Sequence, residues 1–166
     1  MANAKLITAE RLHEVLHYDP ETGVWTWNQP SQKGKKKAGK RAGCINADGY
    51  WQIKVDRSIY PAHKLAFLYM LGKFPSPQSD HRDLNKANCA WQNLREATIS
   101  QNAANRRPKH GGLKGTSFDP KRKKYFACIC KDRKAINLGR YVSEADAHEA
   151  YRIAATEFHG EFARFE

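Results

Sequence analysis

The residues of this sequence with the clearest chemical potential are an aspartate and the histidine that follows it, Asp80-His81, in a polar loop rich in asparagine. Asn93 and Asn102 follow at 12 and 21 residues from the histidine. Asp and Asn oxygens suit Mg²⁺ or Mn²⁺ better than zinc, and an imidazole can take a proton from water. Hydrolysis of a phosphodiester needs these parts. The same residues also occur in ordinary Asn-rich turns, so the pattern alone leaves both interpretations open.

The distribution of charge favours a polyanionic partner. The chain of 166 residues has 29 Lys and Arg against 17 Asp and Glu, a formal net charge of +12. Basic residues concentrate at 33–41 and 106–140. One such run is often only a solvated face, but two runs, the second interleaved with Tyr125 and Phe126, favour a phosphate-binding surface. The candidate DNA-binding residues are Lys35, Lys36, Lys37, Lys40, Arg41, Arg106, Arg107, Lys114, Lys121, Arg122, Lys123, Lys124, Arg133, Lys134 and Arg140.

Several classes of protein are excluded by composition. No apolar run approaches the length of a membrane helix, and the N-terminal residues lack the apolar segment of a secretory signal. The four cysteines are scattered and form no C-x-x-C pair, which argues against a disulfide framework and a zinc knuckle. We therefore expect no membrane partner and a cytoplasmic location.

Local patterns predict a mixed α+β fold in three segments. In the first, Thr8 can cap a short helix, residues 24–27 and 51–55 alternate as strands do, and residues 63–71 form a second helix. In the second segment, residues 79–107, a polar loop precedes a helix capped by Thr98 or Ser100. The third segment has strand-like pieces at 116–118, 125–130 and 135–138, then a helix that begins after Ser143.

His63 and the four tryptophans are expected to serve the packing of the fold rather than metal or base binding. His63 lies on a predicted helix just before the Asp80-His81 pair, where a packed, hydrogen-bonded histidine is a better expectation than a metal ligand. The four tryptophans, Trp25, Trp27, Trp51 and Trp91, are expected in the core or in hairpins rather than as platforms for stacking bases.

Residues 79–106 resemble the HNH (ββα-metal) endonucleases of phages and mobile introns. The similarity is carried by Asp80-His81, Asn93-Leu94-Arg95 and Gln101-Asn102. Residues 8–75 are also similar to the N-terminal part of such phage enzymes. The resemblance implies that Asp80 and Asn102 hold a single divalent ion, Mg²⁺ or Mn²⁺, that His81 is the general base, and that Asn93 orients the loop.

Residues 114–165 resemble the APETALA2-type DNA-binding domain, which is a three-stranded sheet packed on one helix. In such domains the sheet lies in the major groove of DNA. The matching residues are Gly115–Phe118, Tyr125–Ile129, Leu138–Tyr141 and His159–Arg164. The outward strand positions offer few groups for reading bases, so we expect this segment to grip phosphates. Deleting residues 114–166 should then weaken DNA binding and leave the chemistry of the Asp80-His81 pair intact.

Together these features predict an α+β chain with an N-terminal region and an HNH domain over 1–107, a linker over 108–113, and an APETALA2-like domain over 114–166. The predicted function is metal-dependent hydrolysis of double-stranded DNA to 5′-phosphate and 3′-hydroxyl ends by a free-standing phage homing endonuclease, without a small-molecule cofactor. A monomer in the cytoplasm of a bacterial host is favoured. The alternative is a non-catalytic DNA-binding regulator that retains a decayed nuclease fold.

Overall fold

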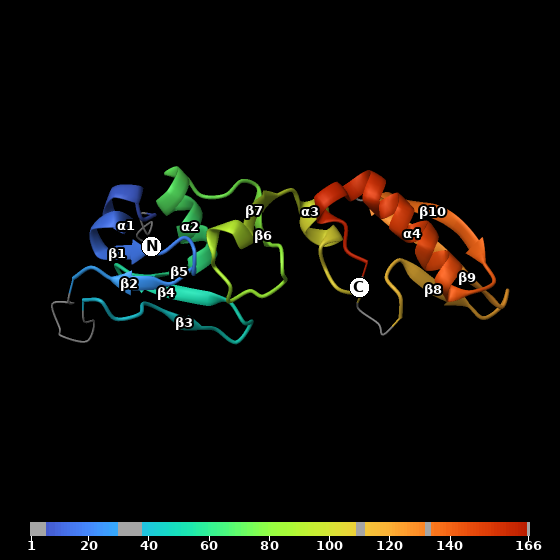
Figure 1. Cartoon of the computed structure of the whole chain (residues 1–166), viewed down its shortest axis with the longest axis horizontal. Coiled ribbons are helices and arrows are strands. Elements are labelled where there is room, and N and C mark those ends of the chain that lie inside the picture. Colours follow the sequence, from blue (N-terminus) through green and yellow to red (C-terminus); the bar gives the residue numbers. More distant parts are fainter. Residues whose placement is uncertain (1–5, 30–37, 109–111, 132–133, 166) are drawn as a thin grey trace, which may run out of the picture. The chain divides into compact units, whose positions relative to one another are not determined.

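The computed structural model describes residues 6–29, 38–108, 112–131 and 134–165. The chain divides into two compact units, Met1–Glu96 and Ala97–Glu166 (Figure 1). Within the described ranges the structure contains small sheets and four α-helices, so the α+β class is confirmed. No helix in these ranges is long and apolar enough to cross a membrane.

The first unit begins with helix α1 (Ala9–Val15), as predicted. The Thr8 hydroxyl accepts a hydrogen bond from the backbone N–H of Arg11, which satisfies one donor at the helix start. The chain then enters strand β1 (Leu16–Tyr18), which the sequence pattern did not indicate. Strand β1 pairs antiparallel with the predicted strand β2 (Trp25–Trp27) across a turn at residues 19–23.

A second, three-stranded sheet follows in the order β3-β4-β5. Its strands are β3 (Cys44–Ile45), β4 (Trp51–Val55) and β5 (Ser58–Pro61), and they run antiparallel. Helix α2 (Ala62–Leu71) starts directly after β5 and ends at Gly72, whose φ of 69° is the left-handed conformation that favours glycine. The predictions of β4 and α2 are confirmed.

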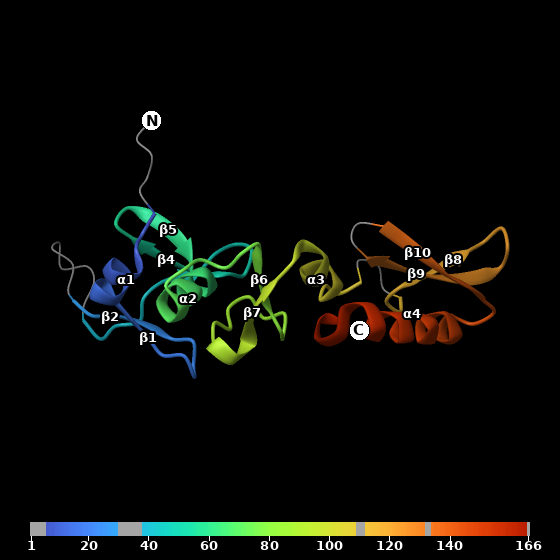
Figure 2. The same cartoon turned by 90° about the horizontal axis from the view of Figure 1, so that it is seen from above.

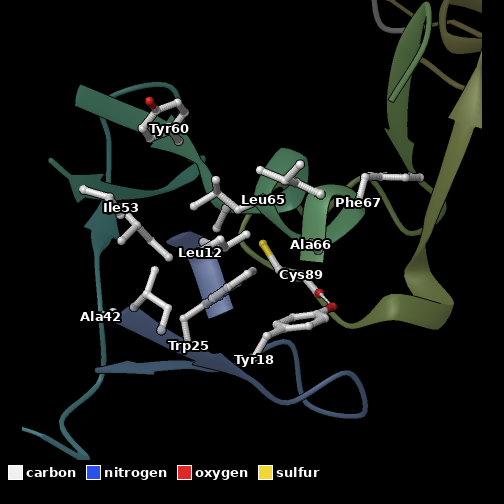
Figure 3. Close-up of a cluster of buried hydrophobic side chains, with 14 of the residues drawn as sticks. Leu12, Tyr18, Trp25, Ala42, Ile53, Tyr60, Leu65, Ala66, Phe67 and Cys89 are labelled. Carbon is white, nitrogen blue, oxygen red and sulfur yellow. Dashed lines mark hydrogen bonds between the residues drawn. The ribbon is translucent and has the colours of Figure 1, made fainter. Parts of the chain in front are cut away.

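The core of the first unit joins these elements to the loop that follows the Asp80-His81 pair. Leu12, Trp25, Ile53 and Leu65 are buried together (Figure 3). Cys89, from the loop, lies in the same cluster, and burial raises the pKa of its thiol to about 12, so it packs as a neutral apolar group.

The turn between β1 and β2 supports this loop directly. The Tyr18 hydroxyl donates a hydrogen bond of 2.6 Å to the Cys89 carbonyl (Figure 3). Gly23 has a φ of 72°, and a Cβ at this position would lie 2.3 Å from the backbone of Cys89 and Ala90. Only glycine allows this close approach, so residues 19–23 fix the base of the loop.

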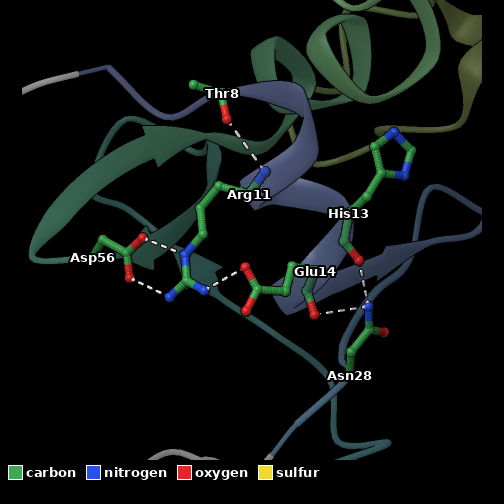
Figure 4. A network of polar contacts seen from close by, with 6 residues as sticks. All are labelled: Thr8, Arg11, His13, Glu14, Asn28 and Asp56. Atoms are coloured by element: carbon green, nitrogen blue, oxygen red, sulfur yellow. Dashed lines mark hydrogen bonds and ion pairs between the residues drawn. The ribbon is translucent and has the colours of Figure 1, made fainter.

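On the surface of the same unit, Arg11 forms a small polar network. Its Nε and Nη2 atoms donate to the two carboxylate oxygens of Asp56 at 2.9 and 3.1 Å, and Nη1 lies 2.8 Å from Glu14 (Figure 4). These side chains are exposed, so the pairs add about 1 kcal/mol or less to stability.

The first unit ends with two paired strands, β6 (Gln78–His81) and β7 (Leu94–Ala97), with a 3₁₀ turn η1 (Trp91–Asn93) before β7. Helix α3 (Ile99–Ala104) follows. Thr98 and Gln101 form a reciprocal capping box at its start, as the polar cap in the sequence predicted.

The second unit is a sheet covered by a helix. Strands β8 (Thr116–Asp119), β9 (Lys124–Lys131) and β10 (Lys134–Tyr141) form an antiparallel sheet in the order β10-β9-β8. Helix α4 (Glu144–His159) begins after the Ser143 cap and lies along one face of that sheet (Figure 2). Its Tyr151 and Ala155 are buried in one cluster with Ile129 of β9. All four predicted elements are confirmed.

Helix α3 belongs to this second unit. It contacts strand β9 and the 3₁₀ turn η2 (Gly160–Phe162). The Lys114 ammonium group donates a hydrogen bond to the carbonyl of Ala104 in the last turn of α3, where the helix dipole favours a positive charge. The division between the two compact units falls before α3. The linker predicted at 108–113 stays a prediction, and its residues 109–111 lie outside the described residues.

Candidate active site

Asp80 and His81 occupy the last two positions of β6, and both side chains are buried. The Asp80 carboxylate is 4% exposed and pairs with the Arg95 guanidinium of β7, with Nε 2.9 Å and Nη2 2.8 Å from Oδ2. The neighbouring strand thus supplies the partner that a buried carboxylate requires.

Asn93 ties the two ends of the intervening loop together. Its side-chain amide donates to Asp83 Oδ1 at 2.9 Å and to the Asn88 carbonyl at 3.0 Å, and its Oδ1 accepts from the Asp83 backbone N–H. Its backbone carbonyl accepts from the N–H of Arg82, next to His81. The loop is therefore closed by one buried asparagine immediately beyond the histidine.

Asp83 is the second organising residue of the loop. Its carboxylate accepts hydrogen bonds from the side chains of Asn88 and Asn93 and from the backbone of Asn85. Partial burial acts to raise the pKa of Asp83, but these hydrogen bonds outweigh it and the pKa lies below its ordinary value. Asp83 is therefore charged at neutral pH and holds the loop in shape.

The imidazole of His81 lies among aromatic side chains from other elements of the first unit. Its ring centroid is 4.9 Å from that of His63 on α2 and 6.1 Å from that of Tyr50, which precedes β4. Burial lowers the pKa of His81, the carboxylates of Asp83 and Asp80 oppose this shift, and the charge of Lys86 adds to it. His81 is thus neutral near pH 7, the form that can accept a proton.

His63 is buried as predicted, but among the described residues its Nδ1 atom lacks the hydrogen bond that we expected of a packed histidine. It is 6% exposed, packs edge-on against His81, and its Nδ1 atom has no hydrogen-bond partner in the described part of the chain. Burial lowers the pKa of His63 to about 3, with smaller contributions from His81, once that histidine is protonated at low pH, and from the positive charge of Lys64. His63 is therefore a neutral ring at the back of the site.

The depressed pKa of His63 makes stability depend on pH. The unfolded chain takes up a proton at this histidine below about pH 6.5, whereas the folded protein does so only near pH 3. Stability is therefore lost as pH falls through this window. Between pH 7 and 5 we expect wild type to lose about 2 kcal/mol more unfolding free energy than His63→Leu.

Denaturant unfolding followed by tryptophan fluorescence measures this difference, because all four tryptophans lie in the first unit. An identical loss of stability in wild type and in His63→Leu over this pH range would contradict the assignment of a neutral His63.

The structure brings Asp80, His81 and Asn93 together in the first unit, whereas Asn102 lies on α3 in the second. Among the residues that the structure describes, no group of three or more His, Cys, Asp or Glu side chains is arranged to hold a metal ion. A carboxylate with an amide oxygen is nevertheless a hard donor set that suits Mg²⁺, which completes its shell with water and phosphate. The donor chemistry of Asp80 and Asn102 thus fits the expected ion.

Most of the expected DNA-binding cations that the structure describes have exposed side chains. Lys40 and Arg41 lie in the first unit, where Arg41 stacks over Trp51 at 4.0 Å. The exposed cations of the second unit are Arg106, Arg107, Lys121, Arg122, Lys123, Lys124, Lys134 and Arg140. Four expected residues, Lys35, Lys36, Lys37 and Arg133, lie outside the described residues.

Lys114 differs from the other expected cations in its surroundings, and its binding of phosphate stays a prediction. Its side chain is half-buried and its ammonium group is bonded to Ala104, and burial lowers its pKa to about 8, with a further contribution from the charge of Arg164. This lysine is used inside the second unit to hold the end of α3.

Sequence reasoning gave Arg95, Asp83 and Tyr50 no role at the site. In β7 both Leu94 and Arg95 are buried, so the strand does not alternate and its pattern gives no sign of a buried arginine. Asp83 follows His81 by two residues in a run that reads as an ordinary turn. The pairing of β6 with β7 places Arg95 beside Asp80, and the closure of the loop places Asp83 near His81. Tyr50 reaches His81 from the segment before β4.

Comparison with known proteins points to a nuclease family. Residues 60–104 match the family model of the HNH endonucleases, and the matched segment runs from β5 to the end of α3. It includes Asp80, His81, Asn93 and Asn102. No curated protein matches the chain. Residues 60–104 are therefore an HNH endonuclease domain, and the protein that carries it is a DNA endonuclease of the HNH type.

Proposed function

We propose that the protein hydrolyses double-stranded DNA in a metal-dependent reaction that leaves 5′-phosphate and 3′-hydroxyl ends. The observation that carries this proposal is the buried Asp80-His81 pair at the end of β6, inside the segment that matches the HNH endonucleases. Asp80 and Asn102 would hold one Mg²⁺ or Mn²⁺ ion in a ββα-metal arrangement of β6, β7 and α3. That ion would neutralise charge on the scissile phosphate and on the departing 3′-oxygen.

His81 and Asn93 have different roles in the proposed reaction. His81, neutral at pH 7, accepts the proton of the water that attacks phosphorus. Asn93 keeps the loop after His81 closed, so that the imidazole stays at the strand end. A monomer is favoured, and we expect no small-molecule cofactor besides the metal ion.

The second unit would act as an APETALA2-like DNA-binding domain. In support, it is a three-stranded sheet packed on one helix, with exposed lysines and arginines at strand ends and turns. Lys121, Lys123 and Lys124 surround the turn between β8 and β9, and Arg140 lies on β10. Such cations bind the phosphate backbone without reading sequence. The biological role that fits this combination is that of a free-standing phage homing endonuclease in the cytoplasm of a bacterial host.

Cleavage of supercoiled plasmid tests the proposed chemistry. We expect nicked or linear product with Mg²⁺ or Mn²⁺ and none with EDTA, because Asp80 is negatively charged and Asn102 is neutral, so neither can replace a cation at the phosphate. Nicks should be resealed by a DNA ligase, which requires a 5′-phosphate and a 3′-hydroxyl. Cleavage that persists in EDTA, or nicks that ligase fails to close without prior end repair, would refute the proposed reaction.

A further inference from the structure

The buried ion pair between Arg95 and Asp80 joins two neighbouring strands at the active site. Arg95 Nε and Nη2 lie 2.9 and 2.8 Å from the same oxygen, Asp80 Oδ2. The two side chains are 7% and 4% exposed. The Nε hydrogen bond and the Nη2 ion-pair contact converge on one oxygen, and together they restrict rotation of the carboxylate about its Cβ–Cγ bond.

A second arginine–aspartate pair in the same unit provides a comparison. Arg11 also donates through Nε and Nη2, but its two donors address the two different oxygens of Asp56 (Figure 4). That pair is exposed to solvent and lies between α1 and the turn after β4. The Arg95 pair differs in burial, in its convergence on one oxygen, and in its place next to His81.

A contribution to the stability of the fold does not explain why this ion pair is buried. Removing two charges from water costs about as much as their attraction returns, and well-packed apolar residues often serve a fold as well or better. A fixed orientation of the carboxylate, by contrast, is what a metal ligand needs. Carboxylates that bind metals are held by hydrogen bonds from outside the ligand shell, and losing these typically costs about 10–100-fold in affinity or activity.

We propose that Arg95 is a positioning residue that orients the Asp80 carboxylate for binding a divalent cation. This inference rests on the proposed role of Asp80 as a metal ligand. Arg95 acts through Asp80 and requires no contact with DNA. Its positive charge also opposes a nearby cation, so the effect of orientation must be separated from the effect of charge.

Two substitutions make this separation. Arg95→Lys keeps the positive charge and a donor for Oδ2 but loses the planar pair of donors. Arg95→Gln keeps a donor and removes the charge. Arg11→Lys is the matched control, because it makes the same change in an arginine–aspartate pair of the same unit away from β6 and β7.

Binding of Mn²⁺ alone is the direct measurement. Mn²⁺ broadens NMR signals of nearby protons even when it binds weakly, and the ring signals of His81 are identified by their loss in His81→Ala. For both Arg95→Lys and Arg95→Gln we expect about tenfold more Mn²⁺ to be needed for half-maximal broadening. We expect no change for Arg11→Lys. Cleavage by the Arg95 variants should approach the wild-type rate at saturating Mn²⁺. The Mn²⁺ concentration needed for half-maximal cleavage therefore rises, while the maximal rate stays nearly the same.

The outcomes distinguish this inference from the proposed function. Asp80→Asn should weaken Mn²⁺ binding as well, and if it does not, Asp80 is no ligand and both proposals fail. If Asp80→Asn weakens binding while Arg95→Lys binds as wild type and Arg95→Gln binds more tightly, Arg95 is only a counter-charge and the inference alone is overturned. If tryptophan fluorescence shows that one Arg95 variant is unfolded, Mn²⁺ binding by the other variant decides whether Arg95 orients Asp80.

Discussion

Replacing His81 by alanine is expected to slow DNA cleavage by about 10²–10⁴-fold, the usual contribution of a positioned general base. The imidazole lies at the end of β6, next to the buried Asp80 carboxylate, and its lowered pKa keeps it unprotonated near pH 7. DNA affinity should stay nearly unchanged, because the exposed cations that would contact phosphates lie elsewhere. Single-turnover cleavage rates and DNA titrations of the same preparations measure the two quantities separately.

His17→Ala is the matched control for this experiment, because His17 is an exposed histidine on β1 in the same unit. Tryptophan fluorescence should show that the first unit is folded in both variants. Wild-type activity of a folded His81→Ala protein at neutral pH would remove His81 from the mechanism and leave the Asp80-His81 pair as a structural feature.

Removal of the second unit beyond residue 113 is expected to have the next largest effect. Each phosphate neutralised contributes about −0.9 to the slope of log affinity against log salt. If five contacts are lost, the slope should flatten by about 4.5, which amounts to about 500-fold between 50 and 200 mM salt. Titrations of full-length and shortened protein against duplex DNA at several salt concentrations measure this change.

The structure adds a catalytic defect that the sequence did not lead us to expect. Helix α3, which carries Asn102, packs on β9 and η2 and is held by Lys114, all of which belong to the second unit. A chain that ends at residue 113 loses β9 and η2, so it should cleave more slowly even at saturating DNA.

Lys114→Met separates the loss of α3 support from the loss of phosphate contacts. It removes the hydrogen bond to Ala104 and keeps the exposed cations. We expect a lower cleavage rate with an unchanged salt slope.

Two outcomes with the shortened protein would contradict these expectations. An equal salt slope for the full-length and shortened proteins would show that the second unit does not bind phosphates. Full cleavage by the shortened chain would show that α3 needs no support from the second unit.

Local sequence determined most of the secondary structure. Thr8, Thr98 and Ser143 each begin a helix through the polar cap that the sequence displays, and Gly72 ends one. These features depend on residues three or four positions apart, so they can be predicted without knowledge of the fold. Strand β1 was missed because its three residues, continuous with α1, are too few to show a period of two.

The residue types of the site, Asp80, His81, Asn93 and Asn102, were also determined by the sequence alone, because metal ligation and proton transfer each restrict the side chains that can perform them. What surrounds them was decided only by tertiary structure. Arg95 meets Asp80 through the pairing of β7 with β6, and His63 reaches His81 from α2. The burial that makes His63 neutral and turns Lys114 inward arises from packing between segments distant in sequence, which no local pattern of residues records.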